Sequence, residues 1–288
     1  MPALATLAAG FFLTIALTTH LDLLLILLAA VLLLCASYVW GYSTHALKGI
    51  RWRNLTHLQR QQYAEVWDSL ASSPELAMAA ACGELEEGGV RHSAGKPLNQ
   101  LLRLAKVNLQ DDVLEIGCGV GRIGLELAPH CRHWTGADIS ANMLACAADR
   151  LRALKNVRLV QLQDISLRGM AAGSFDVVYS TNMFAHIDQM DRWRYVEEAF
   201  RVLRPSGRLC IDNLDMESER AWASFAIGAK ISQQHERPPY LPTLSTAPEL
   251  MAYATQAGFQ QVQPHREQPL VIVTAVKPNL AAKSLPKN

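Results

Sequence analysis

The chain has 288 residues, half of them hydrophobic, and a formal net charge of +1 at pH 7. This length accommodates one large domain with an appendage or two modest domains, and the near-zero charge argues against a nucleic-acid partner. Six scattered cysteines without a CxxC pair argue against a disulfide framework and a zinc site, and no other cluster has metal-ligand spacing. We therefore expect a protein of a reducing compartment that holds no metal ion.

The N-terminal segment, residues 1–45, is predicted to be a membrane anchor. Its only Asp, Glu, Lys or Arg is Asp22, and most of the remainder forms two apolar runs, Ala3–Thr19 and Leu21–Trp40. Each run approaches the roughly 20 residues that an α-helix needs to cross a bilayer. The polar residues where the runs meet predict a tight turn, so we expect a transmembrane helical hairpin that contacts the membrane through residues 3–40.

Aromatic and cationic side chains follow the second apolar run. Trp40 and Trp52 are interleaved with Lys48, Arg51 and Arg53, which is typical of the cytoplasmic flank of a membrane span. We therefore expect the inner (cytoplasmic) membrane as the location, with the rest of the chain facing the cytoplasm. A signal peptide fits less well, because the segment lacks a basic start and a small-residue cleavage site. A single span and a buried helical pair in a soluble protein remain as alternatives.

Residues 46–97 are predicted to form a mainly helical cap. Tyr63 and Trp67 belong to an apolar stripe at helical spacing, and we expect this stripe to pack in the core rather than to line a site. Ser73 followed by Pro74 predicts the start of a further helix, because proline suits the first helical position.

Two stretches that contain glycine, Gly88-Gly89 and Gly95-Lys96-Pro97, are predicted to break the helical pattern. A new helix is expected over Leu98–Ala105. On this interpretation His92 lies in a solvated loop between the two breaks.

Beyond this cap, short apolar runs alternate with helical patterns. Such alternation predicts parallel strands with helices on both faces, an α/β doubly wound sheet. Ligands of these sheets bind beyond the carboxyl ends of the strands. The predicted strands are Val113–Ile116, His133–Ala137, Val157–Gln161, Phe175–Ser180 and Arg208–Asn213, and the predicted helices are Ile123 to about Pro129, Asn142–Leu154, Arg192–Leu203 and Ala247–Ala257.

The first strand leads into three alternating glycines, Gly117, Gly119 and Gly121. Glycines in this pattern let the backbone pass close to a ligand, and the helix that follows offers free N–H groups. A dinucleotide site is the nearest rival, since Gly119–Gly124 spells GxGxxG, but Gly117 and Cys118 intervene between the strand and this fingerprint. A phosphate-binding Walker loop is excluded because no Gly-Lys-Ser/Thr follows. The stretch is therefore predicted to be a cofactor loop.

Polar side chains follow the other strands at the same expected edge of the sheet. Asp138 follows the second strand, where a carboxylate can accept hydrogen bonds from both hydroxyls of a ribose. Asp164 follows the third strand, in a place suited to an exocyclic amino group, and Asn182 and His186 follow the fourth. The alternative for Asp138 is a helix N-cap, for which Ser140 is an equally good candidate.

Five motifs, in this order, resemble the class I S-adenosylmethionine-dependent methyltransferases. The resemblance implies a mostly parallel, seven-stranded sheet whose last strand is antiparallel, with Phe259–Pro264 and Leu270–Val276 as the final two strands. It covers roughly Leu98 to Pro278, so we expect a methyltransferase domain over residues 98–278 and a polar tail over residues 279–288. The motifs are Val-Leu-Glu-Ile-Gly-Cys-Gly-Val-Gly (113–121), Gly-Ala-Asp-Ile-Ser-Ala-Asn-Met-Leu (136–144), Gln-Asp-Ile (163–165), Phe-Asp-Val-Val-Tyr-Ser (175–180) and Leu-Arg-Pro-Ser-Gly-Arg-Leu (203–209).

The resemblance implies S-adenosyl-L-methionine as the cofactor and suggests its contacts. The glycine loop would hold the methionine end, Asp138 the ribose and Asp164 the adenine amino group. Ser206 departs from the family, which often has glycine in a Pro-Gly-Gly turn, but a type I turn accepts serine at that place. The implied cofactor-binding residues are Glu115, Gly117, Cys118, Gly119, Gly121, Asp138, Ile139, Asp164, Ile165 and Asn182.

His186 is the candidate catalytic residue. A neutral imidazole near pH 7 can accept a proton, and this position lies just past the carboxyl end of the fourth strand. A base is needed only if the nucleophile of the acceptor arrives protonated. The alternative is that His186 packs or forms a hydrogen bond in the helix that follows.

Acceptor choice is expected to depend on the helical cap and on an insertion over Asp215–Thr246. The insertion contains Trp222, Phe225 and a proline-rich stretch, Pro238–Pro242, which predicts an extended cover rather than a helix. An anchored enzyme with an apolar cover favours a lipid-like or membrane-associated acceptor. A small hydrophilic acceptor, with the anchor used only for localisation, and a protein acceptor remain as alternatives. Two alternatives stay open, a catalytically silent S-adenosylmethionine-binding regulator and a dinucleotide-dependent oxidoreductase.

Overall fold

The computed structural model describes residues 63–231 and 241–279, which belong to one compact unit of the chain, Leu58–Asn288. The predicted hairpin over residues 1–45 lies outside the described residues, and so does all but the first residue of the predicted tail. Among the residues that are described, no helix combines the length and the apolar character needed to span a bilayer.

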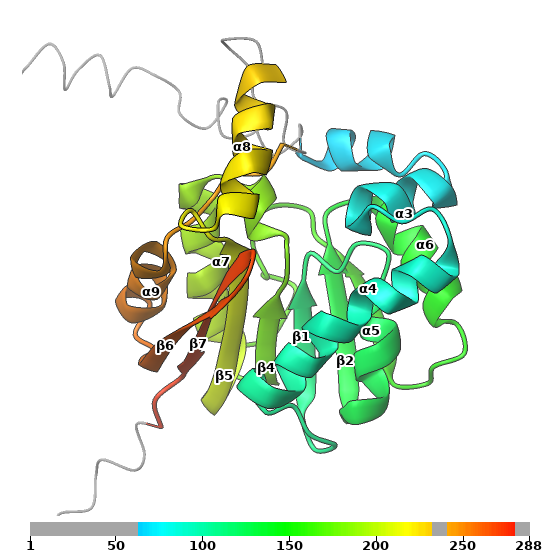
Figure 1. Ribbon diagram of the computed structural model, residues 1–288. Helices are drawn as coiled ribbons and strands as arrows, with labels where there is room; N and C mark the ends of the chain where they lie inside the picture. The colour runs from blue at the N-terminus through cyan, green and yellow to red at the C-terminus, as the bar shows by residue number, and fades with distance from the viewer. Residues whose placement is uncertain (1–62, 232–240, 280–288) are drawn as a thin grey trace, which may run out of the picture. The chain divides into compact units, whose positions relative to one another are not determined.

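A seven-stranded sheet forms the centre of this unit (Figure 1). Its order is β3-β2-β1-β4-β5-β7-β6; the first five strands in this order pair in parallel, whereas β7 runs antiparallel to β5 and β6. The predicted mostly parallel sheet with an antiparallel end is therefore confirmed. The strands are β1 (Asp112–Ile116), β2 (His133–Asp138), β3 (Val157–Gln161), β4 (Phe175–Ser180), β5 (Leu203–Leu214), β6 (Gln260–Glu267) and β7 (Leu270–Val276).

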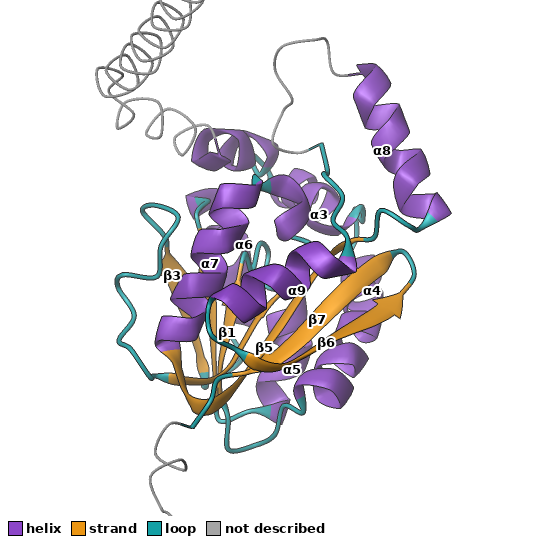
Figure 2. Cartoon of the chain, turned by 90° about the vertical axis from the view of Figure 1, so that its left-hand side faces the viewer, coloured by secondary structure: helices purple, strands orange, loops and turns teal. Residues whose placement is uncertain are grey.

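Helices cover both faces of the sheet, as Figure 2 shows. Residues of α4, α5 and α6 belong to the core of one face, and residues of α7 and α9 to the core of the other. Residues 63–70 are helical. The α-helices that follow are α3 (Pro74–Cys82), α4 (Glu87–Gln100), α5 (Arg122–Leu127), α6 (Ala141–Leu151), α7 (Gln189–Val202), α8 (Glu219–Ile231) and α9 (Ala247–Gln256), and there are also a π-helix, η1 (Leu101–Ala105), and two 3₁₀-helices, η2 (Ala128–His130) and η3 (Phe184–His186).

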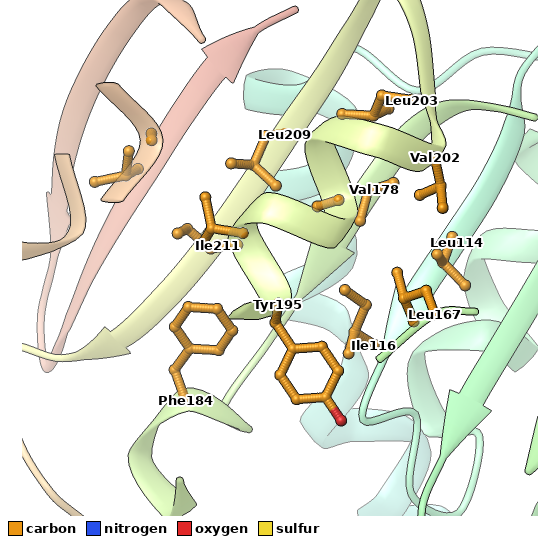
Figure 3. Close-up of a cluster of buried hydrophobic side chains, with 14 of the residues drawn as sticks. Leu114, Ile116, Leu167, Val178, Phe184, Tyr195, Val202, Leu203, Leu209 and Ile211 are labelled. Atoms are coloured by element: carbon orange, nitrogen blue, oxygen red, sulfur yellow. The ribbon is translucent and has the colours of Figure 1, made fainter. Parts of the chain in front are cut away.

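The central strand β1 is buried on both faces, as is typical of parallel sheets. Successive side chains of a strand point to opposite faces. Val113 packs in the core that contains α5, whereas Leu114 and Ile116 pack in the core that contains Tyr195 of α7 (Figure 3). By the same alternation Glu115 lies on the face of Val113, so a carboxyl group is embedded in an apolar layer.

The predicted breaks before the cofactor loop are wrong, because α4 runs continuously through both glycine stretches. At Gly88 and Gly95 a side chain would meet no atom within 4 Å, so these glycines cost the helix only about 1 kcal/mol each. Val90 and Ala94 are fully buried and hold α4 against the rest of the unit. Packing thus outweighs the local preference of glycine.

Pro97 also lies inside α4, where its missing N–H leaves the carbonyl of Ser93 without a helical partner. The guanidinium of Arg122 donates a hydrogen bond to this carbonyl, with an Nη1–O distance of 2.8 Å. The helix predicted over Leu98–Ala105 is accordingly the end of α4 together with η1. His92 is exposed on α4 and does not lie in a loop.

The turn before the predicted strand Arg208–Asn213 is part of β5, which begins at Leu203 and pairs there with Phe175 of β4. Ser206 has a φ of 66°, in the left-handed region that favours glycine. The expectation of a plain type I turn is therefore wrong, since such a turn requires no positive φ. The family preference for glycine at this position has a conformational reason.

The insertion after β5 contains a helix, α8, where an extended cover was expected. Residues 219–231 contain no proline, and the prolines on which the expectation rested come later in the sequence. Residues 232–240 lie outside the described part of the chain.

Candidate active site

A cavity lies beyond the carboxyl ends of β1, β2 and β4, at the edge where such sheets bind ligands. Most of the residues that the sequence assigned to the site line this cavity. They are Glu115, Gly117, Cys118, Gly119, Asp138, Ile139, Ile165, Asn182 and His186.

Two assigned residues, Gly121 and Asp164, do not line the cavity. Gly121 has a φ of 72°, and a side chain there would approach Ala147 and Leu151 of α6 to 3.2 and 3.0 Å. Its role in the structure is to let the loop pack on α6. Asp164 accepts a hydrogen bond from the hydroxyl of Ser166, whereas the adjacent Ile165 reaches the cavity wall.

The glycine loop is fixed by hydrogen bonds to β2. The backbone N–H groups of Gly117 and Cys118 both donate to the carbonyl of Ala137, at 2.8 and 3.1 Å. Gly117 and Gly119 have φ values of 76° and 51°, which explains why glycine is required at these positions. The N–H of Gly119 donates to Oδ2 of Asp138 at 2.7 Å. The loop and the end of β2 therefore form one rigid wall of the cavity.

Asp138 is only 9% exposed, and burial raises the pKa of its carboxyl group. Its Oδ1 accepts a hydrogen bond from the N–H of Ser140 at 2.9 Å. Each carboxylate oxygen has two lone pairs, so both oxygens can still accept a ligand hydroxyl. The alternative of an N-cap is not what the structure shows, because the hydroxyl of Ser140 caps α6 through the N–H of Met143.

A buried chain of hydrogen bonds leads to Glu115 in the cavity wall. The indole N–H of Trp134 donates to the hydroxyl of Tyr179 at 3.0 Å, and that hydroxyl donates to Oε2 of Glu115 at 2.6 Å. Burial raises the pKa of Glu115 to about 8, although the Tyr179 hydrogen bond and the charge of Arg122 oppose this rise. A bound cation would favour the ionised form of this carboxyl group.

A third buried carboxyl group, Asp212, positions the segment after β4. Its Oδ1 accepts a hydrogen bond from the N–H of Asn182 at 2.6 Å, and Asn182 has a φ of 63°. Burial raises the pKa of Asp212 to about 7. The neighbouring hydroxyl of Thr181 lines the cavity, is buried and has no hydrogen-bond partner within the described part of the chain. This hydroxyl is available to a polar ligand.

A second part of the cavity wall is aromatic, and the sequence analysis placed its residues in the core. Tyr63 and Trp67, on the helical residues 63–70, line the cavity. The expectation of core packing is confirmed for Tyr63, which is buried in the core, but the expectation that neither residue lines a site is wrong. The rings of Trp67 and His186 meet edge to face with centroids 5.0 Å apart. The hydroxyl of Tyr63 accepts a hydrogen bond from the N–H of Asp188, the N-cap of α7.

Asp68, on the same helical turn, attaches this aromatic wall to α6. Its Oδ1 accepts hydrogen bonds from the hydroxyl of Ser140 at 2.6 Å and from the N–H of Asn142 at 3.1 Å. An apolar stripe looks the same in a sequence whether it packs in a core or lines a cavity; a carboxylate one residue after Trp67 was the available signal. The other lining residues that sequence reasoning did not assign are Ala80, Ala81, Val120, Arg122, Ile123, Met143, Leu162, Thr181, Met183, Ile187 and Tyr195.

These residues fit S-adenosyl-L-methionine. Asp138 can hold a ribose, and apolar side chains beside it, Ile139, Leu162 and Ile165, can hold a flat base. Glu115 can accept a hydrogen bond from an ammonium group that lies at the glycine loop. A pyrophosphate fits poorly, because two carboxyl groups flank the loop where its negative charge would lie. Among residues 63–231 and 241–279, no group of His, Cys, Asp and Glu has the arrangement of a metal site.

Comparison with known proteins supports this interpretation. Residues 113–207 match the family model described as "Methyltransferase domain". The methyltransferase GfsG of Streptomyces halstedii is 35% identical over 118 residues, which are 40% of this chain and 42% of that protein. The O-methyltransferase rstn1 of Aspergillus nomiae is 27% identical over 166 residues, 56% of this chain and 69% of that protein. The chain thus spans less than half the length of GfsG.

Solved structures share the fold. A possible histamine N-methyltransferase of Thermotoga maritima superposes with a TM-score of 0.52 at 21% identity, over 65% of this chain and 91% of that one. Phosphoethanolamine N-methyltransferase 2 of Haemonchus contortus was crystallised with phosphomonomethylethanolamine and S-adenosylhomocysteine. It superposes with a TM-score of 0.51 at 19% identity, over 64% of this chain and 52% of that one. Residues 113–207 therefore match a methyltransferase domain, and the described unit has the fold of solved S-adenosylmethionine-dependent methyltransferases.

Proposed function

We propose that the chain is a membrane-anchored methyltransferase that moves a methyl group from S-adenosyl-L-methionine to a small-molecule or lipid-like acceptor. The observation that carries the proposal is that the cavity lining combines two kinds of residue. The first is the wall formed by the glycine loop, with the carboxyl groups of Glu115 and Asp138, and the second is the set of aromatic side chains Tyr63, Trp67 and His186. The first suits the cofactor and leaves the second for the acceptor.

The residues of the first wall have separable roles in this proposal. Asp138 accepts hydrogen bonds from the ribose, and Ile139 and Ile165 lie against the adenine. Glu115 accepts a hydrogen bond from the amino group of the methionine part. Asn182 fixes the segment after β4 through its hydrogen bond to Asp212. When bound, the cofactor supplies a methyl group on a positively charged sulfur, which is electrophilic without further activation. The protein therefore has to position the acceptor in line with that methyl group and exclude water, which can supply about 7–11 kcal/mol of the barrier.

His186 is the residue that we assign to proton transfer. It lines the cavity on η3, directly after the segment that holds Asn182, and its ring contacts Trp67. A hydroxyl acceptor would lose its proton to this imidazole as the methyl group is transferred. An acceptor that arrives without a proton on its nucleophilic atom would not need the base.

The nature of the acceptor is inferred from the aromatic wall. Tyr63, Trp67 and Tyr195 offer flat, mostly apolar surface, which suits an apolar or aromatic small molecule. The relatives named above include an O-methyltransferase, and others are named as ubiquinone biosynthesis O-methyltransferases. Their names support a small-molecule acceptor. The lipid-like character is inferred from the apolar runs Ala3–Thr19 and Leu21–Trp40.

The location is part of the proposal. Residues 1–45 would anchor the chain in the cytoplasmic membrane as a hairpin, with the methyltransferase domain on the cytoplasmic side. The cationic residues that follow the second run support this orientation. Protease protection of a C-terminal tag in intact spheroplasts tests it, because cleavage of the tag from outside would contradict a cytoplasmic domain.

Methyl transfer is tested with cofactor labelled on its methyl group and fractionated membrane extract as the acceptor source. We expect label to move to a lipid or small-molecule fraction with the wild-type chain and not with Asp138→Asn, which weakens cofactor binding. Cofactor binding without transfer to any fraction would favour the silent regulator. A thermal shift with NAD(P) and none with S-adenosyl-L-methionine would favour the oxidoreductase, since a ligand stabilises the state it binds.

A further inference from the structure

The helix α8 is apolar around its whole circumference and is nevertheless exposed. Residues 221–229 contain no charged side chain, and their only hydroxyl is that of Ser224. Trp222 is 50% exposed and Ile227 58% exposed. Ala221, in the first turn, is the one residue of this stretch that is fully buried, whereas Phe225, Ala226 and Gly228 are half-buried and the other residues are exposed. Helices that are apolar on all sides are normally covered.

The helix lies at the edge of the sheet where the cavity lies. α8 follows shortly after the carboxyl end of β5, and the hydroxyl of Ser218 accepts a hydrogen bond from the N–H of Ala221 at its start. Figures 1 and 2 both show α8 extending away from the sheet at this edge. The helical residues 63–70, which supply the aromatic wall of the cavity, lie at the same edge.

We propose that α8 lies in the interface of the lipid bilayer that residues 1–45 are proposed to enter. This inference rests on the proposed membrane anchoring. Residues 63–70, the first described residues after the apolar runs in the sequence, lie at the same edge of the sheet as α8. A helix in a bilayer interface buries its apolar side chains among the acyl chains and keeps its charges near the headgroups.

The charges of α8 agree with this placement. Arg220 lies near its start and Lys230 near its end, and Glu219 is its only acidic residue. Cationic side chains at both ends can contact anionic headgroups. Trp222, two residues after Arg220, is the residue type that membrane interfaces favour. The apolar middle of the helix then enters the acyl region between two charged ends.

This placement adds a route for the acceptor. With α8 in the bilayer, the carboxyl edge of the sheet faces the membrane, and the aromatic wall formed by Tyr63 and Trp67 opens toward lipid. A lipid-like acceptor can then enter the cavity from the bilayer without crossing water. The same arrangement would disfavour a freely soluble, highly charged acceptor.

The experiment uses the full chain in vesicles of phosphatidylcholine and phosphatidylglycerol that contain a phospholipid with a diazirine on its acyl chain. After illumination, labelled peptides are identified by mass spectrometry. We expect label in the peptides of residues 3–40 and in that of α8, and none in the peptide of α9, an amphipathic helix on the body of the unit. Trp222→Ser/Ile227→Ser should lower α8 labelling roughly tenfold, because two apolar side chains lose their insertion energy.

Leu109→Ser is the matched control. Leu109 is 67% exposed, but it precedes β1 and so lies at the amino edge of the sheet, away from α8. We expect this variant to leave α8 labelling unchanged. Because Trp222 and Ile227 are exposed, the double variant should keep the thermal stabilisation by S-adenosyl-L-methionine that the wild-type chain shows, which would establish that it folds.

The outcomes separate this inference from the proposed anchoring. Label in residues 3–40 without label in α8 would overturn the inference and leave the anchor standing. Label in α8 alone would support the inference and contradict the hairpin. If α8 instead pairs with a second copy, it stays unlabelled, and the mass of the solubilised particle halves in the double variant, which also overturns the inference. A covering segment of the same chain likewise leaves α8 unlabelled.

Discussion

The guanidinium of Arg122 donates a hydrogen bond to the carbonyl of Ser93, which Pro97 leaves free within α4. Arg122 is the first residue of α5 and follows the glycine loop directly. The charge of Arg122 also opposes the rise that burial causes in the pKa of Glu115 and of Asp212. One side chain thus completes the helix of the cap and moderates the negative charge of the cavity.

This relationship predicts a non-additive pair of substitutions. Arg122→Met should lower the free energy of unfolding by about 1–3 kcal/mol, because it leaves the Ser93 carbonyl without a donor. The same change should cost measurably less in a Pro97→Ala background, since alanine at this position supplies the helical N–H. A double-mutant cycle by urea denaturation measures the coupling. Equal costs in both backgrounds would show that the Ser93 contact contributes nothing.

The raised pKa of Glu115 predicts a pH-dependent stability of the protein without cofactor. Its carboxyl group has a pKa of about 8 when folded, against 4.5 as the ordinary value. Between these values the unfolded chain carries the charge and the folded chain keeps the proton, so this group makes stability fall as the pH rises toward 8.

Glu115→Gln removes this titration but can still accept the hydrogen bond of Tyr179. We expect the variant to gain roughly 2 kcal/mol of stability relative to wild type between pH 6 and pH 9. Thermal unfolding of both chains across this range, with cofactor absent, measures the difference. Parallel profiles would mean that Glu115 is already ionised at pH 6.

Ser206 offers a stabilising substitution. Its φ of 66° costs a serine about 1–2 kcal/mol of folding free energy. Glycine removes this cost, but part of the gain is lost because glycine has more conformational freedom in the unfolded state. Ser206→Gly should therefore raise the free energy of unfolding by about 0.5–1 kcal/mol. The side chain is exposed, so no packing is lost. Ser206→Ala is the control and should bring no gain; a loss of stability in the glycine variant would contradict the argument.

Strands were easier to predict from the sequence than the cap. The bounds of β3, β4 and β7 agree with the prediction, because each is a short apolar run next to turn residues. The continuity of α4 could not be predicted from local preferences, since it depends on Arg122, a residue far along the chain. The contact between these two segments exists only in the folded state.

Only part of the cavity lining could be predicted from the sequence, because only part of it is positioned by the order of the strands. Asp138 and the glycine loop follow strands whose carboxyl ends meet, so topology alone brings them together. Tyr63 and Trp67 reach the cavity from a helix whose place on the sheet no strand order determines. The helix α8 could have been predicted, because residues 219–231 contain no proline and only one glycine.

Arg192 is predicted to be the most sensitive arginine of α7. Its side chain is 2% exposed and donates to the carbonyl of Phe184 at 2.8 Å, to the hydroxyls of Ser245 and Thr243, and to Glu249 at 3.1 Å. It therefore ties η3, which carries His186, to the segment before α9. Arg192→Met should cost about 3–5 kcal/mol, since it breaks a buried ion pair and its hydrogen bonds.

Arg194 is the matched control for this substitution. It lies on the same helix, is 38% exposed and pairs with Asp191 three residues earlier. Arg194→Met should cost about 0.5 kcal/mol or less, as is usual for such pairs. Urea denaturation of both variants makes the comparison. Similar small losses for both would mean that the Arg192 contacts are replaced by others when the guanidinium is removed.

His186→Gln tests the proposed base. If the acceptor is a hydroxyl, methyl transfer at saturating acceptor should fall by about 10²–10⁴-fold, because glutamine cannot accept the proton. Cofactor affinity should stay the same. His92→Gln, an exposed histidine of α4, should change none of these quantities. Full turnover in His186→Gln would contradict the role of His186 as the base.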